Sequence, residues 1–382
     1  MKLLFASDSF KGSLSAIEIC DILETVSARI FPGCETVSVP VADGGEGTVD
    51  ALLRAMGGKR MRTRVTGPIF EPVDAVWGML DDGVTAVMEM AQASGLPYVP
   101  EEARDPRKTT SLGTGEMILD AVRKGARKIL IGIGGSATND GGIGMLTALG
   151  ARFTDADGRP VSPVGGSLGL IRNADFSGLL PELRDTEITV ICDVTNPLLG
   201  ENGATFIYGP QKGAVPAIRD ELEAGMTKYA KVVSEKLGRD IAAFPGAGAA
   251  GGLGAALAGV MGAVLKSGID AVLETVRFDE KLAGVDLVIT GEGQIDGQSI
   301  RFGKVPAGVA KRCALQGIPA AVIVGGIGEG AEGLFDFCES TLQTIVPGPI
   351  SLDDAITNAH VLYTAAAERL LRAIRIGMQI AR

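Results

Sequence analysis

Short apolar runs alternate with glycine-rich and acidic turns along much of the sequence. Runs at residues 2–6, 36–41, 286–290, 320–324 and 342–346 are each followed by a helical pattern or a glycine turn. Uninterrupted apolar runs of this length are typical of parallel strands that are buried on both faces. Together they predict an α/β protein with a flavodoxin-like, doubly wound parallel sheet.

Helical patterns follow several of these runs. Ser15 and Glu18 form a capping-box motif, which predicts a helix that starts there and ends near Ile30. A second helix is expected to end at Met56. An apolar-periodic helix over residues 353–376 is expected to close the chain.

The strand–helix rhythm is interrupted between residues 60 and 90. The runs RMRTRV, DAVWGML and TAVMEMA are separated by GPIFEP and DDG, a pattern typical of an antiparallel meander. The rhythm returns near residue 286. We therefore predict two domains: residues 1–62 with 283–382 form the flavodoxin-like domain, and residues 63–282 form a large inserted second α/β domain.

The most informative stretch is KILIGIGGSATNDGGIG, residues 128–144. It predicts a buried strand, a glycine-rich loop and a helix from about residue 144. Glycines let the backbone approach a ligand and direct N–H groups at an anion such as phosphate, and a helix N-terminus adds to this attraction. Because a lone carboxylate there would repel phosphate, Asp140 is interpreted as a magnesium or hydroxyl partner. The alternative is a purely structural turn.

Acidic residues follow other predicted strands as well. Asp43 follows the second strand, Asp193 follows an apolar run at residues 187–192, and Glu292 follows the strand that resumes the rhythm. Open α/β sheets bind ligands at the carboxyl ends of their strands, and carboxylates there can bind a cation or orient a hydroxyl group. Lys11 lies at the same edge, after the first strand. The alternatives are an Asx turn for Asp193 and a solvated loop residue for Lys11.

Two further segments are candidates, one for binding an anion and one for close approach of two backbones or of a nucleotide. Arg107 and Lys108 precede a predicted helix, where they can hold a carboxylate or phosphate or belong to a simple cap. Gly246, Gly248 and Gly251 match GxGxxG, a weak motif here because no apolar strand precedes it. It would let two backbones, or a nucleotide, approach closely. The GxxxxGK[ST] motif and the protein-kinase motifs do not occur in the sequence.

Composition narrows the classes of function. Hydrophobic residues make up 46% of the 382 positions, aromatic residues 4%, and glycine occupies 54, which suits an α/β protein with tight turns. A net charge of −10 argues against a nucleic-acid surface. The scattered cysteines are expected to be reduced thiols of a cytoplasmic protein, and neither a signal peptide nor a membrane span is expected. The one histidine, His360, is expected to be structural, so acid–base chemistry falls to Asp, Glu or Lys.

The loops SDSFKGS, ADGGEGT, GIGGSATNDGG, CDVTNPLLG, GPQKGA and TGEGQIDGQSIRFGKVP, in this order, resemble the glycerate kinase type-1 family over nearly the whole chain. These bacterial enzymes phosphorylate D-glycerate with ATP. The resemblance implies transfer to the 2-hydroxyl group, giving 2-phospho-D-glycerate and ADP, with Mg²⁺ required. It also implies two α/β domains, the inserted one similar to the restriction-endonuclease fold, with the site in the cleft between them. Neither a nucleic acid nor a membrane is an expected partner, and the oligomeric state is open.

Phosphoryl transfer needs positioning, neutralisation of phosphate charge and an acceptor for the hydroxyl proton. From loop position and residue type we predict Asp193 as the general base or metal-orienting carboxylate, with Asp43 as the alternative. Lys11 is expected to meet the glycerate carboxylate or the migrating phosphoryl group. The predicted magnesium ligands are Glu292, Asp296 and Asp140, and the predicted phosphate and cofactor contacts are Gly134, Gly135, Ser136, Asn139, Gly291 and Lys304.

Other functions remain open at this stage. Gly132, Gly134 and Ala137 satisfy the GxGxxA form after a strand, which also fits a nicotinamide-dependent dehydrogenase of a small hydroxy acid. That alternative lacks a convincing acidic residue at the end of the next strand. A non-catalytic sugar-acid binding protein is a second alternative, although it would need no cluster of carboxylates at strand ends. For a glycerate kinase, the alternative product is the 3-phosphate.

Overall fold

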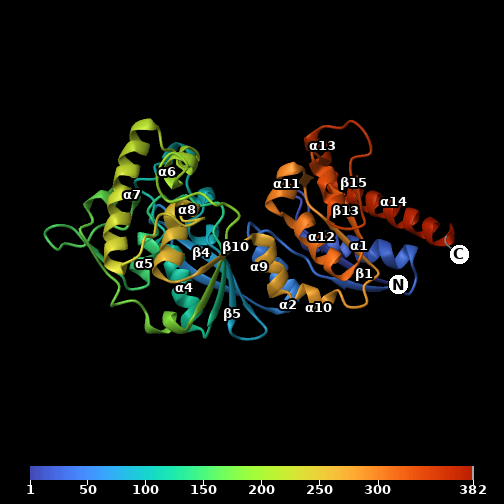
Figure 1. Ribbon diagram of the computed structural model, residues 1–382, viewed down its shortest axis with the longest axis horizontal. Coiled ribbons are helices and arrows are strands. Elements are labelled where there is room, and N and C mark those ends of the chain that lie inside the picture. The colour runs from blue at the N-terminus through green and yellow to red at the C-terminus, as the bar shows by residue number, and fades with distance from the viewer. Residues whose placement is uncertain (381–382) are drawn as a thin grey trace. The chain divides into compact units, whose positions relative to one another are not determined.

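The computed structural model describes residues 1–380 and divides into two compact units (Figure 1). Unit 1 comprises residues 1–57 and the segment from Ser267 onward, coloured blue and orange to red. Unit 2 comprises residues 58–266. Unit 1 is therefore discontinuous in sequence, whereas unit 2 is one continuous segment.

The unit boundaries differ from those predicted at residues 62/63 and 282/283. Unit 2 includes all of β3 (Gly58–Thr66), because this strand pairs along its whole length with β4 (Pro72–Leu80). Unit 1 includes α9 (Gly268–Thr275), because its first residue lies against the backbone of Asp43. The first predicted boundary divides the run at residues 60–65, which the sequence pattern assigns to the meander. The second difference arises from a long-range contact that the local pattern does not encode.

Unit 1 is built on a parallel sheet with the order β2–β1–β11–β13–β15. Its strands are β1 (Lys2–Ser7), β2 (Glu35–Ser38), β11 (Leu287–Gly291), β13 (Ala320–Val324) and β15 (Ser340–Thr344). Numbered along the chain, this is the 2-1-3-4-5 order of flavodoxin-like folds, so the predicted doubly wound sheet is confirmed. The order reverses between β1 and β11, where Ser7 pairs with Gly291.

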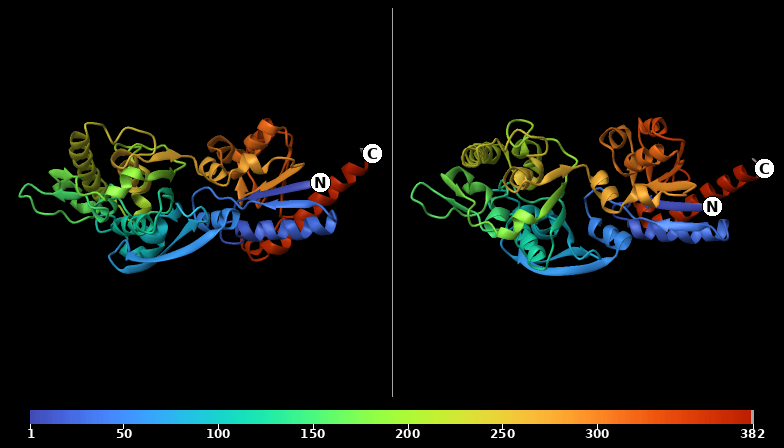
Figure 2. Two further views of the ribbon diagram at one scale, coloured as in Figure 1. Left: turned by 90° about the horizontal axis from the view of Figure 1, so that it is seen from below. Right: turned by 60° about the horizontal axis from the view of Figure 1, so that its bottom comes forward.

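Helices cover both faces of this sheet. The remaining elements of unit 1 are α1 (Ala16–Ile30), α2 (Thr48–Met56), α10 (Phe278–Lys281), β12 (Gln294–Ile295), α11 (Gly297–Phe302), α12 (Val305–Gln316), β14 (Gly326–Ile327), α13 (Leu352–Thr357) and α14 (Ala359–Ile380). The blue α1 and the red α14 lie side by side in Figure 2 and pack on one face. On the other face, Ala310 of α12 packs with Val322 and Val324 of β13. The predicted capping box is present at Ser15.

The C-terminal region differs from the predicted single helix over residues 353–376. Two helices form, α13 and α14, with Asn358 between them. The side chain of Ser351 caps α13 by accepting a hydrogen bond from the N–H of Asp354 (3.1 Å). Asn358 has φ −101° and ψ 13°, which interrupts the helical backbone. The break separates α13, which lines a pocket described below, from α14, which packs on the sheet.

Unit 2 contains a mixed sheet with the order β10–β9–β6–β5–β4–β3. The remaining strands of unit 2 are β5 (Thr85–Glu89), β6 (Lys128–Gly132), β7 (Arg152–Thr154), β8 (Asn173–Asp175), β9 (Glu187–Ile191) and β10 (Val264–Lys266). As predicted, β3, β4 and β5 form an antiparallel meander. The strands β5, β6, β9 and β10 are parallel, so their carboxyl ends share one edge of the sheet.

The helices of unit 2 pack around one large hydrophobic core. They are α3 (Ala91–Ser94), α4 (Leu112–Arg123), α5 (Ile143–Ala148), α6 (Ala204–Tyr208), α7 (Pro216–Leu237) and α8 (Ala249–Gly254). Gly238 ends α7 in the left-handed conformation (φ 67°), which is typical of glycine at the C-terminal end of a helix. In the described part of the chain, no helix combines the length and apolar character needed to span a membrane.

Candidate active site

The candidate site in unit 1 begins where the strand order reverses. Asp8 follows β1 directly, and Glu292 follows β11 directly. Because Ser7 pairs with Gly291 in a parallel register, these two acidic residues lie side by side at the carboxyl edge of the sheet. Asp43 lies in the loop after β2, the strand on the other side of β1. In doubly wound sheets this edge is the usual ligand-binding position.

Asp8 and Glu292 are buried, and burial disfavours the charged form of a carboxyl group. Asp8 is 5% exposed and Glu292 is 6% exposed. Burial, reinforced by the charge of Asp43, raises the pKa of Asp8 from 3.8 to about 7. Burial raises the pKa of Glu292 from 4.5 to about 8; the charge of Lys304 opposes this rise, and the charges of Asp8 and Asp43 add to it. Oε1 of Glu292 is buried and has no hydrogen-bond partner in the described chain. A proton or a cation would therefore stabilise this group.

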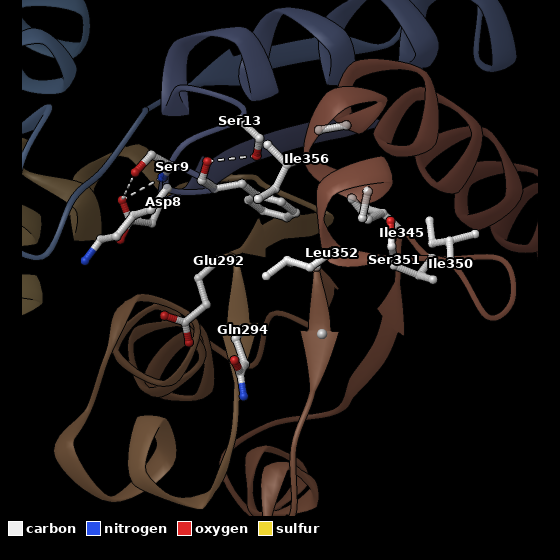
Figure 3. A pocket seen from close by; sticks show the side chains of 18 of the residues that line it. Asp8, Ser9, Ser13, Glu292, Gln294, Ile345, Ile350, Ser351, Leu352 and Ile356 are labelled. Atoms are coloured by element: carbon white, nitrogen blue, oxygen red, sulfur yellow. Dashed lines mark hydrogen bonds between the residues drawn. The ribbon is translucent and has the colours of Figure 1, made fainter.

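These acids line a pocket of about 570 Å³. Lys11 and Lys304 contribute positive charge near them, since the Lys11 charge acts on Asp8 and the Lys304 charge on Glu292. Figure 3 shows the acidic side chains on one side of the pocket and a group of apolar side chains on the other, with Leu352 projecting between them. The apolar lining comprises Phe10, Ile345, Val346, Ile350, Leu352, Ala355, Ile356 and Ala359.

The structure gives the other predicted residues of unit 1 different positions. Lys11, in the loop after β1, and Lys304, at the N-terminus of α12, are exposed and line the pocket. Asp296 is the N-cap of α11: its Oδ1 accepts a hydrogen bond from the N–H of Ser299 (2.8 Å), and this bond is the main cause of its lowered pKa. A Cβ at Gly291 would lie 1.9 Å from a carbonyl oxygen of β13. Asp296 therefore caps a helix, and Gly291 permits close strand packing.

In unit 2, the predicted glycine-rich loop follows β6. Gly134 and Gly135 are exposed, and no atom lies within 4 Å of the position that a Cβ would take at Gly134. Gly135 has φ 74°, a conformation that favours glycine. Asn139 is buried, and its Nδ2 donates a hydrogen bond to Oγ1 of Thr205 (3.1 Å). The glycine end of the loop is thus open to a ligand, whereas the Asn139 end is packed inside the unit.

A buried lysine, Lys212, donates hydrogen bonds to this loop from the interior of unit 2. Nζ of Lys212 donates hydrogen bonds to Oγ of Ser136 and to the carbonyl oxygen of Thr138, both at 2.7 Å. Lys212 is 2% exposed. Burial lowers the pKa of Lys212 from 10.5 to about 7, although the charge of Asp140 opposes this change. The amine therefore fixes the conformation of the loop and is close to titrating at neutral pH.

Asp140 uses its carboxylate within the protein. Its Oδ2 accepts hydrogen bonds from the N–H and Oγ of Ser111, both at 2.8 Å, and from the N–H of Gly144 (3.3 Å). Its Oδ1 accepts one from the N–H of Gly142 (3.0 Å). Burial raises the pKa of Asp140, and these hydrogen bonds oppose the rise. The carboxylate thus satisfies the amides at the starts of α4 and α5, where the sequence predicted a bound anion, so its position favours a structural role over the predicted metal role.

Asp193 lies in the loop after β9 and is exposed. Because β6 and β9 are parallel neighbours and Gly132 pairs with Ile191, this loop and the glycine-rich loop leave the sheet at the same edge. The side chain of Asn196, three residues later, is occupied: its Nδ2 donates to a backbone carbonyl (2.8 Å), and its Oδ1 accepts from the hydroxyl of Tyr208 (2.6 Å). The loop therefore combines an exposed carboxylate with an internally fixed turn.

The GxGxxG segment holds these two loops together. A Cβ at Gly248 would lie 2.1 Å from the carbonyl oxygen of Pro197 in the Asp193 loop. A Cβ at Gly251 would lie 2.0 Å from the carbonyl oxygen of Thr138 in the glycine-rich loop. Of the two interpretations of this motif, close approach of backbones is the one that these distances support.

The remaining candidates lie apart from these loops or are paired. Arg107 forms ion pairs with Asp105 (2.9 Å) and Glu221 (3.3 Å), and Lys108 also pairs with Asp105 (3.4 Å). His360 is exposed in the first turn of α14. Within residues 1–380, no three or more His, Cys, Asp or Glu side chains are grouped so as to hold a metal by themselves. The cysteines are free thiols.

Comparison with known proteins identifies the family. A profile described as the glycerate kinase family matches residues 3–375. The chain belongs to the glycerate kinase family. It is 48% identical to glycerate 2-kinase of Escherichia coli (strain K12), with 99% of each chain covered, and 46% identical to glycerate kinase of Bacillus subtilis (strain 168), with 99% of this chain and 98% of the relative covered. A crystal structure from Salmonella typhimurium LT2, assigned provisionally as glycerate kinase 2, superposes with a TM-score of 0.91 at 42% identity and covers 99% of each chain.

In this member of the glycerate kinase family, the predicted site residues fall into two groups. Unit 1 brings together Lys11, Asp43, Glu292 and Lys304 around one pocket. Unit 2 holds the glycine-rich loop and the Asp193 loop at one edge of its sheet. The predicted convergence of both groups at one cleft stays a prediction.

Two chemically important residues were missed by sequence reasoning. Asp8 directly follows the first strand, as Asp43 and Asp193 follow theirs. In this loop, however, the sequence analysis assigned a role only to Lys11, three residues later. Lys212 lies in the GPQKGA segment, which contributed to the family resemblance but gave no role to this lysine. No local signal shows that this lysine is buried against the glycine-rich loop, because that contact joins residues 76 positions apart.

Proposed function

We propose that the protein transfers the γ-phosphoryl group of ATP to the 2-hydroxyl group of D-glycerate, producing 2-phospho-D-glycerate and ADP. The observation that carries this proposal is the 48% identity, over 99% of both chains, to a relative named glycerate 2-kinase. The buried acids and flanking lysines in unit 1 are the kind of site that phosphoryl transfer requires, because that reaction depends on positioning and on neutralising phosphate charge.

Mg²⁺ fits the acidic end of the unit 1 pocket. Its preferred ligands are oxygens, and it is commonly bound through one or two carboxylates together with substrate phosphates. Glu292 has a buried Oε1 without a partner in the described chain, and Asp8 and Asp43 supply adjacent carboxylates. Glu292 and one of these neighbouring carboxylates, together with phosphate oxygens of the nucleotide, would hold the ion, which would neutralise charge on the transferred phosphoryl group. Asp296 and Asp140 were also predicted ligands, but neither lines this pocket: Asp296 caps α11, and both carboxylate oxygens of Asp140 accept hydrogen bonds within unit 2.

The residues of this chain would perform the other tasks. Lys11 and Lys304 would neutralise phosphate or glycerate charge at the mouth of the pocket. The open glycine end of the unit 2 loop, with Gly134, Gly135 and Ser136, would bind an anionic group through backbone amides. Asp193 is our candidate to accept the hydroxyl proton, since it is an exposed carboxylate at a sheet edge, and Asp43 is the alternative.

The proposal is tested by measuring ADP release from Mg²⁺–ATP in the presence of D-glycerate, L-glycerate, glycolate and lactate, with phosphorus NMR of the product. We expect ADP release that depends on D-glycerate and a single 2-phosphate product. A 3-phosphate product would overturn the assigned position of transfer. Absence of glycerate-dependent ADP release, or a glycerate-dependent change in nicotinamide absorbance, would overturn the kinase proposal itself.

A further inference from the structure

We propose that the unit 1 pocket is the nucleotide subsite, with its apolar end holding the purine and ribose of ATP and its acidic end holding the triphosphate. This inference rests on the proposed function and deepens it, since nothing in the family assignment says which part of the fold binds which substrate. D-glycerate would then bind elsewhere than the apolar end of this pocket.

The first argument is the size and direction of the pocket. Its volume of about 570 Å³ is in the range of sites that enclose nucleotide-sized ligands. Its lining comes from the loops after β1 and β11 at one end and from the segment after β15 at the other. In the strand order, β1 and β15 are separated by three interstrand spacings, or about 14 Å at about 4.8 Å each. An extended nucleoside triphosphate spans such a distance, whereas a three-carbon acid does not.

The second argument is the chemistry of the far end. Ile350, Leu352 and Ile356 line the pocket and remain 43%, 74% and 38% exposed. A cluster of exposed large apolar side chains next to a polar pocket is typical of a ligand-binding surface. Glycerate carries a carboxylate and hydroxyl groups and has almost no apolar surface to place against these residues. A purine ring offers a flat apolar face of suitable size.

The third argument is that both ends of one ligand are accommodated at once. Figure 3 shows Leu352 between the acidic side, with Asp8 and Glu292, and the apolar side, with Ile345 and Ile350. Gly325 and Gly326 also line the pocket between the two ends. A Cβ at Gly326 would approach no atom closer than 4.0 Å, so the missing side chain leaves room for a ligand. The acidic end suits a cation-bound triphosphate, and the apolar end suits the base.

The test is the variant Leu352→Asp, with Leu315→Asp as a matched control. Leu352 and Leu315 are both exposed leucines on helices of unit 1, at 74% and 80%, but only Leu352 lines the pocket. Loss of the apolar contact and the added negative charge are expected to weaken binding of Mg²⁺–AMP-PNP by about tenfold or more in isothermal titration calorimetry. The KM for ATP should rise similarly, whereas the KM for glycerate should not change. Leu315→Asp should leave all three values unchanged, and Leu352→Met should restore nucleotide binding.

The failures of the two proposals are distinguishable. If Leu352→Asp raises the KM for glycerate and leaves AMP-PNP binding intact, or leaves both unchanged, the nucleotide subsite is overturned while the kinase activity stands. If the wild-type protein binds AMP-PNP in a manner that depends on Leu352 but shows no glycerate-dependent ADP release, the proposed reaction is overturned while the nucleotide subsite stands.

Discussion

Replacing Glu292 by Gln should stabilise the protein at alkaline pH while impairing catalysis. Glu292 is nearly fully buried beside Asp8, and burial raises its pKa from 4.5 to about 8. Gln has the shape of the protonated side chain without its titration. A carboxylate kept in such a position costs stability whenever it ionises, which is expected where a site is organised for a ligand and not for folding.

The sign and size follow from the direction of the pKa change. Between pH 4.5 and about 8 the folded state keeps a proton on Glu292 that the unfolded state loses, so the wild-type free energy of unfolding falls as pH rises through this window. At about 1.4 kcal/mol for each pKa unit, the full effect is at most about 5 kcal/mol. The free energy of unfolding of the Gln variant does not fall in this way, because Gln does not titrate. The variant should therefore be no more stable than the wild type near pH 4.5 for this reason, and more stable by a few kcal/mol at pH 9.

Urea unfolding in EDTA without substrate at pH 5 and pH 9 measures this difference. Trp77, the single tryptophan of the chain, is fully buried in unit 2, so its fluorescence follows that unit. A transition in far-ultraviolet circular dichroism that the fluorescence does not share reports unit 1. Glu332→Gln, which removes an exposed carboxylate of unit 1, is the control and should show no such pH-dependent gain. An equal stability difference at both pH values for Glu292→Gln would refute the reasoning.

Three further predictions follow from the site geometry. Asp193→Asn should lower glycerate-dependent ADP release by about a hundredfold or more if this residue is the general base, and near-normal turnover would exclude it from the reaction. Gly268→Ala places a Cβ 1.9 Å from the carbonyl oxygen of Asp43, so it should lower both activity and melting temperature, whereas Gly377→Ala, where no atom lies within 4 Å, should do neither. Wild-type stability should rise between about pH 7 and pH 10.5, because in that range the unfolded state retains the Lys212 proton and the folded state lacks it. Lys212→Met should abolish this rise. Melting temperatures at pH 7 and pH 10 measure it, and an unchanged pH dependence in the variant would contradict the reasoning.

The sheet of unit 1 could be predicted from sequence because its signal is local. Buried parallel strands are short apolar runs, and the runs at 2–6, 286–290 and 320–324 correspond to β1, β11 and β13 to within a residue or two. The difference in the placement of α9 is tertiary in origin, because it depends on contact with the Asp43 loop. The break at Asn358 is not marked by proline or glycine in an otherwise periodic segment.

The site was predictable only in part, for related reasons. Acids that follow strands are visible in the sequence, because parallel strands end at one edge, and this identified Asp43 and Glu292. Whether a carboxylate is available depends on which amides face it, and the sequence cannot show that Asp140 accepts hydrogen bonds from Ser111, 29 positions away. An exposed apolar residue on a short helix, such as Leu352, has the same local pattern as one that packs into a core.

The discontinuity of unit 1 has a consequence for the order of events during synthesis. Its central strand pair joins Ser7 to Gly291, so β1 has no β11 to pair with until the ribosome has made most of the chain. Unit 2 is complete once Lys266 has emerged, and it can acquire its native structure first. Until then, residues 1–57 contain only the β1–β2 pair of the unit 1 sheet, so β1 keeps one unpaired edge while unit 2 folds.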